Sequence, residues 1–392
     1  MKRINKLDKT IDNQFVEKFI KFIEKKSISW YWISRNPNIT ADIIEKYIDK
    51  WDFNGISMNP NLIMDIINKY PNKPWNWFEI SQNPNLTIEM IKMHLDKPWN
   101  WDWISKNKSI TMEMIKDNLH LPWEWSSVSI NPNITIEMII NNSYNWCWHG
   151  ISRYSQLIMK LLEILPEKPW TWYWVSRNQY VTMEYIEQHQ DKPWDWEAIS
   201  WNPNVTIEMV NKYPKICEWY AISMNSNITL DIIENNTKMW DWRAVSMNPN
   251  ITIEFIEKHN KPWDWNIISL HMNITIEILD KYIDKWEWEG LSYNPYITIE
   301  MIDKYHLWNY TALSSNPNIT MELIEKYSNE SWNWDVINEN QMTRAKELFR
   351  LQKYREHMAA FTIQQYYMRA KYIPIYSYCR KLHLQFYESI KN

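Results

Sequence analysis

Glycine is nearly missing from this chain, which has 3 Gly among its 392 residues. β-Helices and leucine-rich horseshoes turn a tight corner in every coil, and such corners usually need residues that tolerate positive φ. Asparagine can occupy some of those corners. The shortage of glycine nevertheless favours short helices joined by turns that contain Asn and Pro.

Cysteine and long apolar runs are also scarce. The three cysteines, Cys147, Cys217 and Cys379, are far apart, which favours buried, reduced thiols in a cytosolic setting over a disulfide framework or a metal cluster. The chain shows no apolar N-terminal segment and no apolar run of about 18 residues. Neither secretion nor a membrane span is therefore expected.

Known catalytic signatures are missing as well. The sequence has no P-loop, no GxGxxG, no HExxH and no Cys/His pair at metal-ligand spacing. We therefore expect no catalytic residues, no metal and no cofactor.

What the chain does contain is a repeat. The stretch WDWEAISWNPNVTIEMV at residues 194–210 recurs in near copies from about residue 28 to residue 338. The serine that closes its first half stands in thirteen copies at intervals of 22 to 24 residues, and Asn338 takes its place in a degraded fourteenth copy. The serines are Ser34, Ser57, Ser81, Ser105, Ser129, Ser152, Ser176, Ser200, Ser223, Ser246, Ser269, Ser292 and Ser314.

Each copy predicts two short helices. The Asn-Pro dipeptide after the serine ends the first helix, because a residue before proline avoids the helical region. A threonine such as Thr206 then caps the second helix, and the carboxylate of Glu208 favours its first turn. In six copies a proline precedes the first Trp and suits the first helical turn: Pro74, Pro98, Pro122, Pro169, Pro193 and Pro262.

Two positions of the first helix indicate how the repeats pack. We interpret the Trp columns as core, since a two-turn helix has little else to bury, rather than as stacking platforms for sugars or bases. The residue two before the serine is small in many copies, which lets the next helix approach closely. The exceptions are Trp32, Glu79, Trp103, Ser127, Trp174 and Ile267.

The units predict an all-α fold, an α-solenoid of about 13 two-helix repeats spanning residues 28–338. Its contour, with helices packed about 8–10 Å apart, should run to on the order of 100–130 Å. Residues 1–27 carry apolar side chains at spacings of three and four, which predicts a capping helix over the exposed end of the first repeat.

Composition changes at residue 339, where a basic helical tail begins and runs to residue 392. Residues 344–392 hold ten Lys or Arg against three Glu, a net charge of +7, so the chain's total of −4 leaves −11 on residues 1–343. An acidic array therefore ends in a basic tail.

Part of the tail resembles an IQ motif, the helical target of calmodulin-like proteins. Ile363 and Gln364 are followed by Arg369 and Lys371, with the basic residue one place late and Ala370 where glycine is usual. A second basic pair, Arg380 and Lys381, follows. The alternative is an amphipathic helix that packs back on the last repeat and leaves its charges solvated.

The repeat W-x-W-x-x-I-S-x-N-P-N-I-T-x-E-x-I, together with HMAA at 357–360, IQQ at 363–365 and CRKL at 379–382, resembles the tryptophan-rich repeat proteins of giant DNA viruses of amoebae. The resemblance covers about residues 28–390. It implies a viral protein, in the host cytoplasm or the virion, and transfers no activity and no catalytic residue.

Function is expected to be a non-catalytic scaffold for protein–protein interaction, because stacked repeats offer a long surface without a unique pocket. The alternatives are a nucleic-acid-binding helical repeat protein, which the charge of −11 opposes, and binding of a calmodulin-like partner through the tail.

The position just after the serine is the candidate partner-binding edge, because it varies most among positions that are not turn tips. Basic or polar residues, including Arg153 and Arg177, hold five of its first seven places. A run of apolar or aromatic residues follows, which should concentrate interface energy or, in the alternative, be buried as core. That run is Trp201, Met224, Met247, Leu270 and Tyr293.

Overall fold

The computed structural model describes residues 2–26, 29–141, 144–213, 217–236, 240–372, 381 and 385. Within these residues all regular structure is helical, and the α-solenoid predicted from the repeat is confirmed. The first helices of the repeats are α2 (Trp30–Arg35), α4 (Phe53–Ser57), α6 (Trp77–Ile80), α8 (Trp101–Lys106), α10 (Trp125–Val128), α12 (Trp148–Tyr154), α14 (Trp172–Arg177), α16 (Trp196–Ser200), α18 (Trp219–Ser223), α20 (Trp242–Val245), α22 (Trp265–His271), α24 (Trp288–Tyr293), α26 (Tyr310–Leu313) and α28 (Trp334–Glu339).

The second helices alternate with them. They are α3 (Ala41–Lys46), α5 (Met64–Lys69), α7 (Ile88–Met93), α9 (Met112–Lys116), α11 (Ile136–Asn141), α13 (Ile158–Ile164), α15 (Met183–Gln188), α17 (Ile207–Lys212), α19 (Leu230–Asn235), α21 (Ile253–Lys258), α23 (Ile276–Lys281), α25 (Ile299–Lys304) and α27 (Met321–Lys326). Two longer helices, α1 (Lys2–Glu24) and α29 (Thr343–Tyr372), flank the array.

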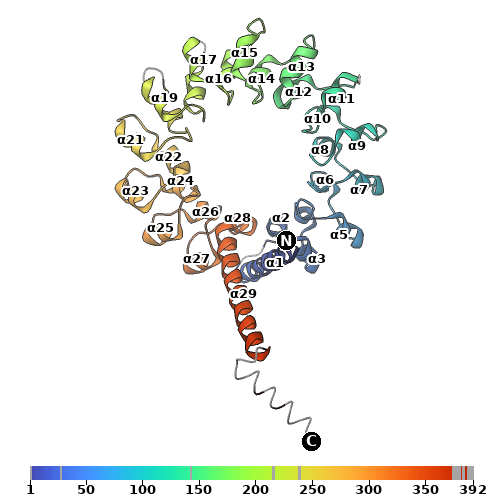
Figure 1. Ribbon diagram of the computed structural model, residues 1–392, viewed down its shortest axis with the longest axis vertical. Helices are drawn as coiled ribbons and strands as arrows, with labels where there is room; N and C mark the ends of the chain where they lie inside the picture. Colours follow the sequence, from blue (N-terminus) through green and yellow to red (C-terminus); the bar gives the residue numbers. More distant parts are fainter. Residues whose placement is uncertain are drawn as a thin grey trace.

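The α-solenoid closes on itself and forms a ring. Figure 1 shows the first helices in an inner circle and the second helices in an outer circle, with α28 beside α2. The stacking of two-helix repeats was predicted, whereas the closure of the stack was not. The sequence does not display the small rotation per repeat that decides whether the array closes.

Each repeat helix is too short to be stable alone. The helices of the ring have four to seven residues, whereas an isolated helix in water needs about 12–15. The predicted threonine N-caps are confirmed: Thr206 Oγ1 accepts from the backbone N–H of Met209 at 3.4 Å. Such caps satisfy N–H groups that have no partner inside a helix.

The six prolines do not lie in the first helical turn, and this prediction was wrong. Each stands two residues before the N-cap, as Pro193 does before Asp195, whose carboxylate accepts from the N–H of Ala198 at 2.9 Å. A cap placed between the two Trp side chains provides the helix start. The helix therefore begins at Trp196 rather than at Trp194.

The repeating serine joins consecutive first helices. Ser81 Oγ donates to the carbonyl of Trp77 within its own helix at 2.8 Å. The same oxygen accepts from the backbone N–H of Asn100, at the start of the next first helix, at 2.9 Å. A hydroxyl can donate and accept at once, so a fully buried serine fixes both helices without leaving an unpaired polar group.

The asparagine two residues after the serine forms a second link between repeats. The side-chain amide of Asn59 donates to the carbonyls of Ser34 and Asn36 at 2.8 and 3.0 Å, while its oxygen accepts from the N–H of Asn61 at 2.9 Å. Equivalent bonds recur around the ring, and we call them the asparagine ladder. They let the chain turn without positive φ, since among the described residues only Met342 has it.

The Trp columns form the core, as predicted. Trp99 is 8% exposed, donates its indole N–H to the carbonyl of His94 at 2.8 Å and meets Trp77 edge to face with ring centroids 5.0 Å apart. The first bond satisfies a carbonyl at the end of the preceding second helix. Each such ring buries on the order of 150–250 Å².

The ring closes with the same bonds that join internal repeats. The side-chain amide of Asn36, in the first repeat, donates to the carbonyls of Asn338 and Asn340, in the last, at 2.9 and 3.0 Å. Asn38 donates in turn to the carbonyl of Gln341 at 2.6 Å. The asparagine ladder therefore continues across the seam, the junction of α28 with α2.

Helix α1 completes the outer circle instead of capping one end. It lies between α27 and α3, where a fourteenth second helix would stand (Figure 1), with Lys18 bound to Glu322 at 2.9 Å and Lys46 to Glu17 at 2.5 Å. Phe22 packs 6.5 Å from Trp334, on the side where the next repeat would supply a Trp. The predicted N-terminal helix is present, but it covers both ends of the array.

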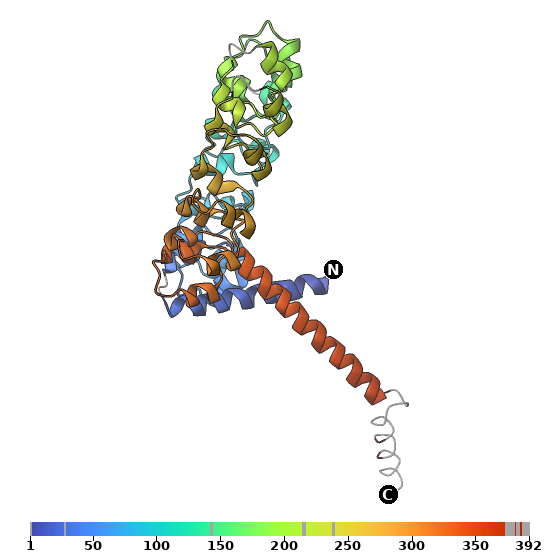
Figure 2. The same ribbon diagram turned by 90° about the vertical axis from the view of Figure 1, so that its left-hand side faces the viewer.

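Helix α29 fastens α1 to the ring and then projects away from it (Figure 2). Arg350 donates to both carboxylate oxygens of Asp12 at 2.6 and 2.5 Å, which raises the pKa of the guanidinium. Phe349 lies 5.7 Å from Phe15. Burial lowers the pKa of Lys346, whose ammonium also reaches Asn38 at 3.0 Å.

Candidate binding surface

The residues that face the centre of the ring follow from the register of the first helices. The residue before the serine is buried in the core in every repeat, as Val175 and Ile199 are. At 100° per residue, the residue three before the serine and the residue one after it each lie about 160° around the helix from that buried residue. Because the second helices lie outside (Figure 1), these two positions point toward the centre. We call them the inner positions.

From α12 to just beyond α20, aromatic rings and guanidinium groups form one connected series. The guanidinium carbon of Arg153 lies 4.0 Å from the ring centre of Trp174, and that of Arg177 lies 5.9 Å from Trp174 and 5.0 Å from Trp201. The Trp201 ring is 6.2 Å from that of Tyr220, whose hydroxyl donates to the sulfur of Met247 at 3.6 Å. We call these residues the inner strip: Arg153, Trp174, Arg177, Trp201, Tyr220 and Met247.

The two arginines of the inner strip differ from other cations at inner positions. Arg35 pairs with Glu339 at 3.3 Å, and Lys106 pairs with Asp102 at 2.7 Å. Within the described residues, Arg153 and Arg177 form no ion pair with a carboxylate, and Arg177 donates only to the hydroxyl of Tyr173 at 3.2 Å. Their charges are held by aromatic faces and remain uncompensated.

The structure brings four predicted residues together. Arg153, Arg177, Trp201 and Met247 belong to the inner strip, and Met224 occupies the same inner position in the repeat between the last two. Trp201, Met224 and Met247 are half-buried, so the binding edge and the alternative of burial between helices both stay predictions.

Two predicted residues lie apart from the inner strip. Leu270 and Tyr293 are 46% and 47% exposed, and they continue the inner positions beyond Met247. The arrangement therefore joins the basic part of the predicted edge to the start of its apolar part.

Trp174 and Tyr220 were missed as candidates. Trp174 was visible in the sequence as a large residue at the small position two before the serine, and Tyr220 as an aromatic residue on the same helix face as Met224. The sequence alone did not show which side of each first helix faces the centre of the closed array.

The predicted tail residues are placed only in part. Ile363 and Gln364 are exposed on α29, and Lys381 is exposed. The side chains of Arg369 and Lys371, and the whole of Arg380, lie outside the described residues. The described part of α29 beyond Arg355 projects from the ring (Figure 2), so the alternative in which it packs back on the last repeat does not apply there.

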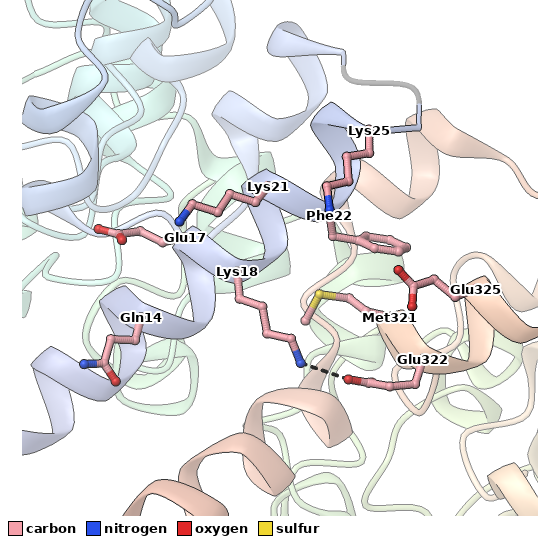
Figure 3. A pocket seen from close by; sticks show the side chains of 9 residues that line it. All are labelled: Gln14, Glu17, Lys18, Lys21, Phe22, Lys25, Met321, Glu322 and Glu325. Carbon is pink, nitrogen blue, oxygen red and sulfur yellow. Dashed lines mark hydrogen bonds and ion pairs between the residues drawn. The ribbon is translucent and has the colours of Figure 1, made fainter.

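A pocket of about 380 Å³ lies in the outer circle, between α1 and α27. Figure 3 shows Lys18 reaching across it to Glu322, with Lys21 extending toward Glu17. Met321 and Phe22 contribute its apolar lining. The pocket is open to solvent, and its ion pair serves the closure of the ring.

The remaining reactive or ionisable side chains have structural explanations. Cys147 and Cys217 are half-buried free thiols, and burial raises the pKa of Cys217 to about 11. The pKa of Glu89 is lowered by hydrogen bonds from its own backbone N–H and from Thr87, as expected for a carboxylate in a first helical turn. The described residues contain no group of three His, Cys, Asp or Glu able to hold a metal ion.

No helix in the described part of the chain is long and apolar enough to cross a membrane. No protein-family model, no curated protein and no solved structure matches this chain.

Proposed function

We propose that this protein is a non-catalytic ring-shaped scaffold that binds a protein partner on its inner surface. The observation that carries the proposal is the contrast between two sets of residues. The serine, asparagine and tryptophan positions repeat almost unchanged, and their side chains are buried in contacts between repeats. The inner positions vary, and they include the two arginines without a carboxylate partner and half-buried aromatic rings of the inner strip. Aromatic, Met and Arg side chains are the ones that concentrate binding energy at interfaces.

A catalytic role has less support. The recurring carboxylates near the start of the second helices act as helix-end charges, and the pKa values of Glu89, Glu277 and Glu300 are lowered. A general acid at neutral pH needs the opposite shift. The resemblance to repeat proteins of giant viruses supports a place for the scaffold in an infected host cell or a virion.

Replacing Trp201, Met247 and Tyr293 together by Ala tests the proposal. The amount of partner retained from host-cell extract should fall while the melting temperature stays within about two degrees, because none of the three side chains is among the fully buried residues of the core. Loss of partner together with a fall of several degrees would mean that the three side chains are structural. Unchanged retention would contradict the inner surface as the binding face.

The tail supports a second candidate function, binding of a calmodulin-like partner. Phe361 and Met368 lie on one side of α29, while Ile363 and Tyr367 lie roughly opposite at 100° per residue, and all four are exposed. A partner must enclose the helix to cover both sides, and the net charge of +7 favours an acidic one.

The full-length protein should bind calmodulin in titration calorimetry, and the double substitution Phe361→Asp and Ile363→Asp should abolish the signal. The matched control is Leu351→Asp, nearer the ring on the same exposed helix. Absence of binding by the unmodified protein would contradict this second function.

A further inference from the structure

The two arginines of the inner strip are prepared for planar anions. The guanidinium carbon of Arg153 lies 4.0 Å from the ring centre of Trp174 and 4.8 Å from that of Tyr154, and that of Arg177 lies 5.0 Å from the ring centre of Trp201. Stacking of this kind leaves the N–H groups at the edge of the guanidinium plane, where a carboxylate binds through two parallel hydrogen bonds. Ring contacts also restrict the side chains before a ligand arrives, which lowers the entropy lost on binding.

The spacing of the two guanidinium groups limits the ligand. They lie 4.0 and 5.9 Å from the same Trp174 ring centre, so they are at most about 10 Å apart, the sum of those distances. In an extended peptide, side chains two residues apart point to the same side and are separated by about 6.5–7 Å. This upper bound is compatible with two carboxylates of an acid-x-acid sequence, one at each arginine.

An apolar platform adjoins the second arginine. The ring centroids of Trp201 and Tyr220 are 6.2 Å apart, and the hydroxyl of Tyr220 donates to the sulfur of Met247 at 3.6 Å. The side chains are half-buried and lie in or directly after successive first helices, so they offer a fixed surface. A peptide held by its carboxylates at Arg153 and Arg177 meets this platform with the residues that follow.

We propose that the inner strip binds an extended peptide segment with an acid-x-acid sequence next to a large apolar residue. This inference rests on the proposed function and specifies the chemistry of its partner. The carboxylates pair with Arg153 and Arg177, and the apolar side chain lies against Trp201 and Met247.

A nucleic acid suits the same surface less well. Residues 1–343 carry a net charge of −11, and the inner positions include the carboxylates of Asp102, Glu197 and Glu289. A polyanion would be repelled along most of the ring, whereas a peptide with two charges is attracted only at the inner strip. Methionine in the platform also suits aliphatic and aromatic side chains.

Fluorescence anisotropy with the full chain tests the proposal. The probe is a labelled peptide containing Asp-Gly-Asp followed by Phe-Leu, and its twin carries Asn-Gly-Asn in place of the acids. The acidic peptide should bind at least about tenfold more tightly than its twin, and the double substitution Arg153→Gln and Arg177→Gln should remove that difference. Lys160→Gln, on the outer helix of the same repeat as Arg153, is the matched control and should leave binding unchanged.

Equal binding of the two peptides would overturn the proposal, and so would loss of binding in the Lys160 variant. Tighter binding of a single-stranded RNA oligonucleotide than of the acidic peptide, through the same two arginines, would also overturn it in favour of a nucleic-acid surface. If the acidic peptide fails while the Trp201, Met247 and Tyr293 variant still loses its partner, the chemistry inferred here is wrong and the scaffold function stands.

Discussion

The asparagine two residues after the serine is the side chain on which the geometry of the ring depends most directly. In the tenth repeat, the amide of Asn248 donates to the carbonyls of Ser223, Asn225 and Ile228 at 3.0, 3.0 and 3.1 Å. The residue is fully buried, so water cannot replace these bonds. A buried carbonyl that loses its donor costs about 1–3 kcal/mol.

Asn248→Ala should therefore lower the free energy of unfolding by about 3 kcal/mol or more in urea titrations followed by circular dichroism. Asn273→Ala, an exposed asparagine in the next repeat, should change it by less than about 0.5 kcal/mol. Similar unfolding curves for the two variants would refute the structural role of the ladder.

The glycines allow a second comparison at single positions. A Cβ atom added at Gly55 would lie 2.5 Å from the backbone oxygen of Tyr31, which cannot move without displacing α2. At Gly290 the closest atom is a carboxylate oxygen of Glu287, 3.1 Å away on a flexible side chain. Gly55→Ala should thus lower the melting temperature by several degrees more than Gly290→Ala, measured by differential scanning calorimetry. The reverse order would be inconsistent with this packing.

At these positions the sequence predicted the spacing of the repeated residues better than the hydrogen bonds that they form between repeats. The serine period and the threonine caps could be predicted because they follow from local helix chemistry. The bond from Ser81 to the next repeat and the amide bonds of Asn59 could not, because they join groups about 20 or more residues apart whose approach depends on the stacking.

Among the elements, α1 was predicted as a helix but not as the piece that closes the ring. Its apolar positions show one buried face, and that pattern is the same for a helix covering one repeat or two. What distinguishes the two arrangements is the set of partners beyond its own repeat, such as Glu322 and Arg350, more than 300 residues away in sequence. Pairing at that separation leaves no mark on periodicity.

Deleting residues 1–26 should open the ring at the seam, because the outer circle then lacks one helix and Trp334 loses its contact with Phe22. Small-angle scattering should show a larger radius of gyration and loss of the ring signature in the distance distribution. Deleting residues 357–392 is the control and should keep the ring, because it leaves the bonds of Arg350 and Tyr354 to α1 in place. A closed ring without α1 would show that the asparagine ladder alone suffices.

For the molecule as a whole, charge pairs on the outer circle tie each repeat to the next. Lys281 binds Glu257 at 2.7 Å and Lys326 binds Asp303 at 2.7 Å. The pKa values of Glu257 and Asp303 are lowered, first by the hydrogen bond from their lysine, and those of the two lysines are raised. Such pairs are exposed and individually weak, but they recur around the circumference.

Stability should consequently be flat from about pH 5 to pH 10 and decline in acid. A carboxyl with a lowered pKa stabilises the folded ring above its ordinary pKa, 4.5 for Glu257 and 3.8 for Asp303, and that contribution is lost as the pH falls through the lowered value. The lysine contributions persist until the pH rises past 10.5. Melting temperatures measured between pH 3 and pH 8 test this, and 1 M salt should reduce the difference by screening. A melting temperature that rises toward pH 3 would contradict it.

The closed ring also makes the number of repeats a fixed quantity. With 14 first helices in the inner circle, each unit accounts for 360° divided by 14, about 26° of rotation. An open solenoid can gain or lose a unit at either end by recombination of its gene and remain folded. Here one added or deleted unit leaves an angular mismatch of about 26° at the seam. During evolution this protein should therefore tolerate substitutions at the inner positions far more readily than changes in repeat number.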